Sequence, residues 1–418
     1  MARVDGKAVF IDGALPGEQV RFQVTKRRKS YDLGKTLEIL EASLDRVTPR
    51  CRYFGVCGGC SMQHLRAEAQ LPAKERVLRD NLERIGKVQP ESWLAPLAGA
   101  HWGYRRKARL GVRFVEKKGG VIVGFREKAH SFITPLAACE VLDARVSALL
   151  PALRDLIASL SQPDRIPQIE VAAGDDTVAL AFRHLVPLTA DDDRQLAEFG
   201  RQHGVRIFRQ PGRPDALELI WPENTDPLVY RLPEFNLELE FAPADFIQVN
   251  ADLNRQMLSR ALQLLDPQPV DSVLDLFCGL GNFTLPIARR AGRVLGIEAD
   301  ETLVAKARHN ARRNNIGNAE FRVGDLYHAE APDPWGSERY DKWLLDPPRT
   351  GAIEVVKRLP ESGAPERIVY VSCNPATLAR DSEVLVHAKG YRLKAAGVMD
   401  MFPQTSHVEA MALFERRE

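Results

Sequence analysis

The segment VLDLFCGLGNF, residues 273–283, constrains the fold of this chain more than any other part of the sequence. An apolar run that contains Asp275 leads into a turn with Gly279 and Gly281, and the helical pattern TLPIARRA follows directly. A second apolar run, RVLGIEAD, carries Glu298 about 20 residues further on, where an acidic side chain can accept the two hydroxyls of a ribose. This order of strand, glycine turn, helix and strand predicts a nucleotide-binding unit of an α/β sheet.

The glycine turn favours S-adenosylmethionine over a dinucleotide as the bound molecule. No third glycine stands at the dinucleotide spacing, and Asn282 follows the turn, where the pyrophosphate of NAD would need an exposed helix N-terminus. A methyltransferase is therefore the favoured class, and a dinucleotide-dependent enzyme is the alternative. We interpret Cys278, inside the turn, as a small packing residue rather than a nucleophile.

Two further acidic residues follow apolar runs. Asp325 in FRVGDL can hold an adenine amino group, or, in the structural alternative, cap the N-terminus of a helix. In LLDPPR, Asp346 ends a fourth strand, and two prolines remove backbone donors and stiffen the turn beside the methyl donor. This segment indicates methylation of a planar nitrogenous ring.

A cysteine follows the next predicted strand, in YVSCNPATLARD. Cys373 would lie at the carboxyl edge of the sheet, where ligands bind. The C5 carbon of a pyrimidine is too weak a nucleophile to take a methyl group directly, but addition of a thiolate to C6 activates it. A base must then remove the C5 proton so that the thiolate can leave. In FPQTSHVEAMALFER we favour Glu409 as this base, at a predicted strand VEAMALF, with His407 as the alternative.

A second group of cysteines lies in CRYFGVCGGC. Five residues separate Cys51 from Cys57 and two separate Cys57 from Cys60, so one loop can present three thiolates to one metal centre. Cys139 is the best candidate for a fourth ligand, because the two remaining cysteines lie in other motifs. Four thiolates suit a tetrahedral zinc or a cubane iron–sulfur cluster, and the spacing does not separate the two.

Positive charge is concentrated at one end of the chain. Residues 1–150 hold 27 basic and 16 acidic side chains, and the remaining residues hold 31 and 40. The clusters at 26–29 and 105–113 predict a polyanionic partner such as nucleic acid, with a merely solvated basic face as the alternative. No apolar stretch reaches the roughly 18 residues of a membrane span, and the charged N-terminus argues against a signal peptide. The cytoplasm is the predicted location.

The 418 residues suffice for two or three domains of about 150 residues each. Residues 7–40 contain three short strand-like runs, which predict a small β-barrel that lacks an upstream strand. Residues 66–86 have a helical pattern with the apolar residues Leu71, Val77, Leu78, Leu82 and Ile85. Residues 100–240 alternate strand-like runs with polar turns, and we expect the main boundary near residue 240.

The order of the motifs resembles that of the RNA uracil-C5 methyltransferases over nearly the whole chain. The motifs are CRYFGVCGGC with Cys139, then DFIQVN, LDLFCGLGNF, GIEAD, LLDPPR, VSCNP and DMFPQTSHVE. The segment DGKAVFIDGALPGEQV resembles a TRAM domain. With the cysteine loop it implies the branch that acts on 23S ribosomal RNA at uracil 1939, because the transfer RNA branch lacks both features.

The resemblance implies roles for particular residues. Cys373 corresponds to the family's nucleophile and Glu409 to its base, whereas Gln404 stands where many relatives have histidine, which is expected to alter local hydrogen bonding. A [4Fe-4S] cluster, without implied redox chemistry, would be ligated by Cys51, Cys57, Cys60 and Cys139. The positions that bind S-adenosylmethionine correspond to Gln248, Phe277, Asn282, Glu298, Asp325 and Asp346.

The expected fold is multidomain α/β. It comprises a TRAM/OB-like β-barrel (1–45), a central α+β iron–sulfur domain with an RNA-binding surface (46–240) and a Rossmann-like methyltransferase domain (241–418). The family also implies that the helix near 71–88 can pack onto the catalytic domain. The expected function is methylation of a flipped-out uracil in ribosomal RNA by a monomer. The alternatives are a non-catalytic RNA-binding or ribosome assembly factor and a methyltransferase of another RNA uracil; the motifs do not fit a cytosine-C5 methyltransferase.

Overall fold

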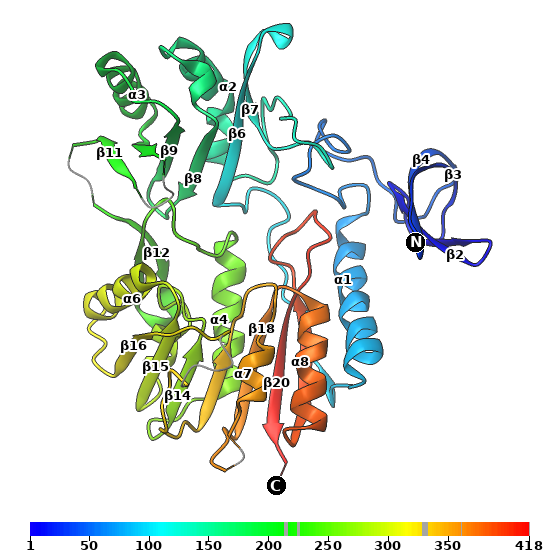
Figure 1. Ribbon diagram of the computed structural model, residues 1–418, viewed down its shortest axis with the longest axis vertical. Helices are drawn as coiled ribbons and strands as arrows, with labels where there is room; N and C mark the ends of the chain where they lie inside the picture. Colours follow the sequence, from blue (N-terminus) through cyan, green and yellow to red (C-terminus); the bar gives the residue numbers. More distant parts are fainter. Residues whose placement is uncertain (213–215, 224–225, 328–332, 361, 418) are drawn as a thin grey trace.

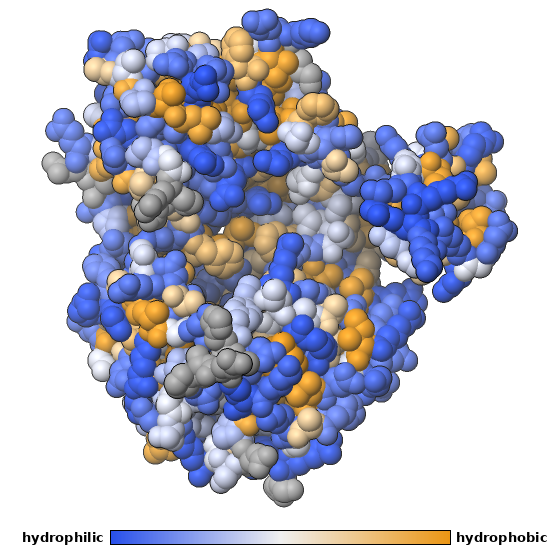
Figure 2. Space-filling view, in the orientation of Figure 1, coloured by the Kyte–Doolittle hydropathy of each residue, from blue (hydrophilic) through white to orange (hydrophobic). Residues whose placement is uncertain are grey.

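The computed structural model describes residues 1–212, 216–223, 226–327, 333–360 and 362–417. Figure 1 shows three groups of elements: a C-terminal α/β domain at the bottom, a central domain above it, and a small N-terminal sheet to one side. On the face drawn in Figure 2 the surface is hollowed between the central and C-terminal domains, with hydrophobic side chains inside the hollow. In the described part of the chain, no helix has the length and apolar character needed to cross a membrane.

The N-terminal residues form a four-stranded sheet in the order β1-β2-β4-β3, with β2 and β4 parallel. Its strands confirm the three that the sequence predicts between residues 7 and 40. Gly34 has a packing reason, since a Cβ there would lie 2.8 Å from the Phe22 ring. Arg46 bonds to the Glu18 carboxylate and lowers the pKa of Glu18 to about 2. The strands are β1 (Ala2–Val4), β2 (Lys7–Asp12), β3 (Gln19–Arg27) and β4 (Tyr31–Glu41).

The central domain has a six-stranded sheet, in the order β11-β10-β9-β8-β6-β7, packed against the helices α2 (Ala144–Ser159) and α3 (Ala190–His203). The pattern of strands and turns predicted for residues 100–240 omitted both helices. Their sequence signals are the caps: Asp143 accepts from a backbone N–H of α2, and Thr189 forms a capping box with Asp192 on α3. The other elements are β6 (Lys107–Val115), η2 (Glu116–Lys118), β7 (Gly120–Gly124), η3 (Pro163–Arg165), β8 (Gln168–Ala173), β9 (Val178–His184), β10 (Arg206–Pro211) and β11 (Glu218–Trp221).

The C-terminal domain has an eight-stranded sheet in the order β16-β15-β14-β17-β18-β20-β19-β5. The first five strands are parallel, and β20 runs antiparallel to both β18 and β19. Chain order runs outward from β14 in both directions, which places a crevice at the carboxyl ends of β14 and β17. The strands are β14 (Ser272–Leu276), β15 (Arg293–Glu298), β16 (Ala319–Val323), β17 (Lys342–Leu345), β18 (Arg367–Ser372), β19 (Tyr391–Met399) and β20 (Glu409–Arg416). The helices are α4 (Ala251–Leu265), α5 (Thr284–Ala288), α6 (Glu301–Arg313), α7 (Ile353–Lys357) and α8 (Pro375–His387).

An early part of the chain lies against this late sheet. Helix α1 (Ala67–Asn81) and the π-helical turn η1 (Leu82–Gly86) pack on α8, and β5 (Ser92–Trp93) pairs with β19 at the sheet edge (Figure 1). The predicted helix is therefore present, but the predicted apolar face was partly wrong. Val77 and Ile85 are exposed, whereas the buried stripe of α1 is Gln70, Lys74 and Leu78.

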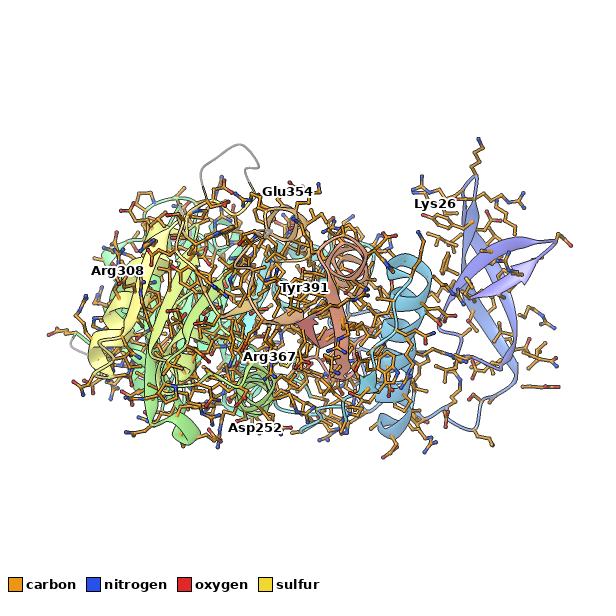
Figure 3. All side chains as sticks on the ribbon, turned by 90° about the horizontal axis from the view of Figure 1, so that it is seen from below. Lys26, Asp252, Arg308, Glu354, Arg367 and Tyr391 are labelled. Atoms are coloured by element: carbon orange, nitrogen blue, oxygen red, sulfur yellow. The ribbon has the colours of Figure 1, made fainter. Side chains whose placement is uncertain are left out.

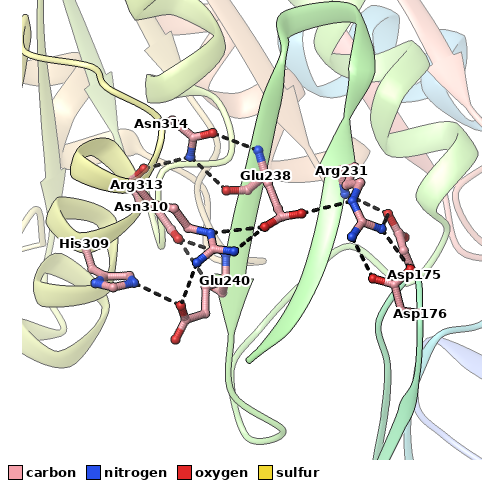
Figure 4. Close-up of polar contacts among 9 residues, drawn as sticks. All are labelled: Asp175, Asp176, Arg231, Glu238, Glu240, His309, Asn310, Arg313 and Asn314. Atoms are coloured by element: carbon pink, nitrogen blue, oxygen red, sulfur yellow. Dashed lines mark hydrogen bonds and ion pairs between the residues drawn. The ribbon is translucent and has the colours of Figure 1, made fainter. Parts of the chain in front are cut away.

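The hairpin of β12 (Leu228–Leu232) and β13 (Leu237–Phe241), with η4 (Pro233–Phe235) between them, joins the central and C-terminal domains. Figure 4 shows Arg231 paired with Asp176 of the central domain on one side. On the other side, Asn310 and Asn314 of α6 bond to main-chain groups of β13. The hairpin therefore fixes one domain against the other through both of its strands.

Candidate active site

A cavity of about 530 Å³ opens at the carboxyl ends of β14, β15, β17 and β18. It lies where the strand order places the crevice of an open α/β sheet. Every strand end contributes a residue that the sequence predicts to be functional. The cavity thus brings together Gln248, Phe277, Asn282, Glu298, Asp346, Cys373, His407 and Glu409.

Asp325 is the predicted site residue that does not line this cavity. Its neighbours Gly324 and Leu326 do line it, whereas the Asp325 side chain is exposed and accepts from the backbone N–H of Tyr327 at 2.8 Å. This bond closes a turn after β16 and not a helix, since no helix begins at this position in the described chain. The carboxylate would have to turn inward to reach a ligand.

The glycine turn has a strained backbone beside the cavity. Phe277 has a φ of 67°, unusual for a residue with a large side chain, and its N–H bonds to the Ile297 carbonyl at 2.9 Å. The Gly279 N–H donates to Glu298 Oε2 at 3.1 Å. The turn therefore holds the ring of Phe277 and the carboxylate of Glu298 at the wall of the cavity.

Asn282 is held by a reciprocal amide pair. Its Oδ1 accepts from Asn254 Nδ2 at 3.0 Å and from the Tyr230 hydroxyl at 3.0 Å, and its Nδ2 donates to Asn254 Oδ1 at 2.9 Å. These bonds use both ends of the Asn282 amide. In this state the side chain shapes the cavity wall rather than presenting a free hydrogen-bonding group.

Asp275 lies beneath the turn, fully buried. Its Oδ2 accepts from the Thr284 hydroxyl at 2.5 Å, while its Oδ1 is buried without a hydrogen-bond partner. Burial, with a smaller contribution from the nearby Glu298 carboxylate, raises the pKa of Asp275 to about 7, although the hydrogen bond from Thr284 acts in the opposite direction. The sequence shows that Asp275 precedes the glycine turn. Only the fold shows that its side chain lies beneath the turn, bonded to Thr284 of α5.

Acidic groups crowd the end of the cavity at Cys373. Burial raises the pKa of Asp346 well above its usual range, and the Glu409 carboxylate adds to this effect. Burial, followed by the charges of Glu409 and Asp346, raises the pKa of the Cys373 thiol to about 11, although the charge of Arg349 acts in the opposite direction. The free protein therefore holds Cys373 as a neutral thiol at pH 7.

Glu409 is the first residue of β20, and its side chain is buried. Burial raises the pKa of its carboxyl group, while a hydrogen bond from His407 and the charges of His407, Arg349 and Lys74 lower it. His407 Nε2 lies 3.2 Å from Glu409 Oε1. The two candidate bases are thus direct partners, with Glu409 the more buried of the two.

Several further residues line the cavity that sequence reasoning did not single out. Tyr327 packs against Phe277, with ring centroids 5.7 Å apart, and Phe402 meets His407 edge to face at 4.7 Å. Phe246 lies at the cavity with 72% of its surface exposed. Arg349 ends the motif LLDPPR and is a cation beside Cys373 and Glu409. Phe246, Phe402 and Arg349 had a signal, because they belong to the recognised motifs DFIQVN, DMFPQTSHVE and LLDPPR, whereas Tyr327 had none.

The other cysteine set meets in a second, small cavity of the central domain. Burial raises the pKa of the Cys57, Cys60 and Cys139 thiols, that of Cys60 to about 12. Within the described residues, no group of three or more His, Cys, Asp or Glu side chains is arranged to hold a single metal ion. Apolar neighbours and Gly59 complete a wall that is shared by Cys51, Cys57, Cys60 and Cys139.

Comparison with known proteins gives this geometry a family. A sequence model described as tRNA (Uracil-5-)-methyltransferase matches residues 229–325 and 336–417. The 23S rRNA (uracil(1939)-C(5))-methyltransferase RlmD of Thiobacillus denitrificans is 56% identical over 416 residues, which cover 100% of this chain and 96% of the relative. The chain belongs to the RNA uracil-C5 methyltransferase family.

Other relatives support this membership. The RlmD proteins of Aromatoleum aromaticum and Azoarcus sp. are 54% and 53% identical over 417 residues, again over 100% of this chain and 96% of each relative. A crystal structure of Pyrococcus abyssi tRNA (uracil-54, C5)-methyltransferase in complex with S-adenosyl-L-homocysteine has a TM-score of 0.76 and 24% identity, covering 98% of this chain and 96% of that one. At this identity the structure supports the fold, an α/β methyltransferase fold of this family.

Proposed function

We propose that this protein is a 23S rRNA methyltransferase that transfers a methyl group from S-adenosylmethionine to C5 of uracil 1939. The observation that carries this function is the identity of more than half, over the full chain, to relatives that are named for that activity. The cavity supports it, because a thiol, a buried carboxylate and the glycine turn line one space. The same site fits uracil chemistry, which needs a nucleophile for C6 and a base for C5.

We assign the donor side of the cavity to Glu298, Phe277, Gln248 and Asp346, with Asn282 fixing the wall. S-adenosylmethionine supplies an electrophilic methyl group when it is bound. Glu298 fits the ribose hydroxyls, since its carboxylate lies at the end of β15 beside Gly279. Asp325 contributes only if its side chain turns away from Tyr327.

We assign the reacting side to Cys373 and Glu409. The Cys373 thiol must lose its proton to bulk water before the sulfur bonds to C6, which moves the electrons of the C5–C6 double bond towards O4 and C5. C5 then bonds to the methyl group as the donor's carbon–sulfur bond breaks. Glu409 takes the proton from C5, the C5–C6 double bond reforms, and the sulfur–C6 bond breaks. Arg349 assists both ends because its charge lowers the pKa of Cys373 and of Glu409.

We further propose a [4Fe-4S] cluster ligated by Cys51, Cys57, Cys60 and Cys139. The support is that four thiols from two distant segments wall one cavity, and four cysteines are the donor set of such a cluster. Bound there, the cluster would cross-link the loop of residues 51–60 to the segment near 139. Protein purified without oxygen should contain iron and acid-labile sulfide, and Cys139→Ser should lose both; stoichiometric zinc without sulfide would contradict the cluster.

We assign RNA binding and methyl transfer to different parts of the chain, using the three predicted domains. We propose that residues 1–45, a TRAM-like barrel, and the central part up to 240 hold the RNA, and that residues 241–418 carry the methyl-transfer site. The packing of α1 and β5 on the C-terminal sheet supports a discontinuous catalytic domain. We place the reaction in the cytoplasm and expect a monomer.

The test is to trap the covalent step. Wild type and Cys373→Ala are incubated with a labelled 23S rRNA fragment containing 5-fluorouridine, with and without S-adenosylmethionine. Fluorine cannot leave C5 as a cation, so a denaturation-resistant protein–RNA adduct is expected only with wild type and the methyl donor. Normal RNA binding without any adduct would contradict the proposed methyltransferase activity and favour an assembly factor. An adduct at a uracil other than 1939 would show that the enzyme methylates a different nucleotide.

A further inference from the structure

The loop Asp400–His407, which we call the base loop, connects β19 to the candidate base Glu409 and is held by residues from the first quarter of the chain. The backbone N–H groups of Ser61 and Met62 both donate to the Gln404 carbonyl at 2.9 Å. The Tyr104 hydroxyl donates to the Pro403 carbonyl at 2.9 Å. Ser61 is the residue after Cys60, so the cysteine loop continues directly into this contact.

Two side chains of α1 complete the attachment. Gln70 Oε1 accepts from the Gln404 N–H at 3.0 Å, and Gln70 Nε2 donates to Gln404 Oε1 at 3.0 Å. Lys74 Nζ donates to Asp400 Oδ1 at 2.6 Å and to the Phe402 carbonyl at 3.0 Å. Both Lys74 and Asp400 are 1% exposed. A buried ion pair is costly unless it is well bonded, so its presence on a surface helix suggests that it specifies a geometry.

The geometry being held is an unfavourable one. Gln404 has a φ of 67°, a left-handed conformation that residues other than glycine adopt rarely, and its backbone N–H, its carbonyl and its side-chain oxygen are all bonded to Gln70, Ser61 or Met62. Backbone strain of this kind persists where the surroundings determine the conformation, often at functional sites. The residues that bond to Gln404 in the described chain, Ser61, Met62 and Gln70, all come from its N-terminal part.

A continuous path of contacts leads from α1 to the Glu409 carboxylate. Lys74 binds the carbonyl of Phe402, whose ring meets His407 edge to face, and His407 Nε2 lies 3.2 Å from Glu409 Oε1. The main chain of Glu409 is fixed by pairing with Met399 in the sheet. The base loop therefore contacts the Glu409 carboxylate through His407, while the sheet fixes the Glu409 main chain.

The nucleophile is held by other elements. Cys373 follows β18, and the next residue, Asn374, donates to the Arg349 carbonyl at 3.0 Å and caps α8. A disturbance of the base loop should thus move Glu409 relative to C5 and leave Cys373 in place.

We propose that Gln70 and Lys74 are positioning residues for the proton-removal step. They fix the base loop in its strained conformation so that the Glu409 carboxylate meets the C5 proton after methyl transfer. This inference rests on the proposed uracil-C5 function. It also connects the cysteine loop to one chemical step, because Ser61 and Met62 bind the same residue, Gln404.

The test separates methyl transfer from proton release. Gln70→Met keeps the side-chain volume but makes none of the amide bonds, and Lys74→Met with Asp400→Asn removes the buried pair without leaving one charge unpaired. Arg76→Met, at an exposed position of α1, is the matched control. A 23S rRNA fragment with [5-³H]uridine and S-adenosyl[methyl-¹⁴C]methionine reports tritium release and methyl transfer in one rapid-quench experiment.

We expect tritium release by Gln70→Met and by the double variant to be about 10- to 100-fold slower than wild type, the loss typical of a base displaced by about 1 Å. Methyl transfer should change less than about threefold, so a ¹⁴C-labelled covalent adduct with ordinary uridine RNA should accumulate. Arg76→Met should match wild type. Parallel losses of both labels, or no loss in either variant, would overturn the positioning role. Absence of methyl transfer by wild type would instead overturn the proposed function.

Discussion

Cys373 illustrates, at the scale of a single residue, that the site is not set for reaction in the free protein. Its thiol has a pKa raised to about 11, because it is half-buried beside two acidic side chains, Glu409 and Asp346. A neutral thiol is a poor nucleophile. Substrate binding must therefore favour the thiolate further, and the residue that already favours it is Arg349.

This leads to a prediction for the reactivity of Cys373. Alkylation by iodoacetamide, followed residue by residue by mass spectrometry, should rise about tenfold per pH unit up to about pH 11. Glu409→Gln removes a negative charge that raises the thiol pKa, so the rate at pH 8 should increase by about 3- to 10-fold. Glu301→Gln, an exposed change on α6, serves as the control. An unchanged rate in Glu409→Gln would show that the two side chains do not interact.

A second prediction at this scale concerns Asp275. Its pKa is about 7 in the folded state and near 3.8 when unfolded, so the folded state binds more protons between those values. The contribution of Asp275 to stability therefore falls as pH rises from about 4 to 7 and is constant above. Asp275→Asn cannot ionise and should gain up to about 4 kcal/mol over wild type at pH 8, about 1.4 kcal/mol for each unit by which the pKa is raised, but little at pH 4.

Urea unfolding of both proteins at each pH measures this difference, with the exposed Asp252→Asn as the control. Asp346 and Glu409 also have raised pKa values and are present in both proteins, so the comparison removes their effects except for the part of the Asp346 shift that comes from the Asp275 charge, the last of its three causes. An equal effect of Asp275→Asn at pH 4 and pH 8 would contradict the assignment.

At the scale of elements, the sequence predicted best where a residue's role depends on its own strand. Glu298, Asp346 and Cys373 each follow or end a buried parallel strand, so periodicity alone brings them to one edge. The sequence failed where the partner is distant: Gln70 and Lys74 are buried because the base loop, more than 300 residues away, lies against them. The spacing of apolar residues along α1 cannot predict a buried polar contact between this helix and a distant loop.

The hairpin β12–β13 gives a prediction for an element contact. Asn310 is fully buried on α6, where its side chain accepts from the Glu240 N–H at 2.8 Å and donates to the Glu240 carbonyl at 3.1 Å (Figure 4). Asn310→Ala leaves these buried groups unpaired and should lower the free energy of unfolding by about 2–4 kcal/mol. Chemical denaturation measures it, with the exposed Arg312→Ala as control. A change under about 0.5 kcal/mol would mean that water replaces the amide.

At the scale of the whole molecule, part of the excess positive charge lies on the N-terminal sheet, away from the cavity of the C-terminal domain. The basic excess of the first 150 residues includes the cluster 26–29 of the N-terminal sheet, and Figure 3 shows Lys26 at the end of the molecule opposite Arg308. The proposed nucleophile Cys373 and the proposed general base Glu409 lie in the C-terminal domain, far along the chain from this cluster. The sequence predicted this separation from charge counts, whereas the route by which α1 returns to the catalytic sheet depended on the family resemblance.

The last prediction tests whether that separated sheet holds RNA. Changing Lys26 and Arg28 to Glu should weaken binding of the 23S rRNA fragment and of unrelated RNA by the same factor, because side chains that bind phosphates read no base sequence. The slope of log affinity against log salt should shrink by about 0.7 for each phosphate that the variant no longer neutralises. Filter binding from 50 to 300 mM salt measures both, with Arg154→Glu and Arg194→Glu as a control pair already neutralised by Asp155 and Asp191. If the slope is unchanged while methylation by the Lys26 and Arg28 variant is normal, the cluster is only a solvated face, and RNA must be held by the basic residues of the central domain.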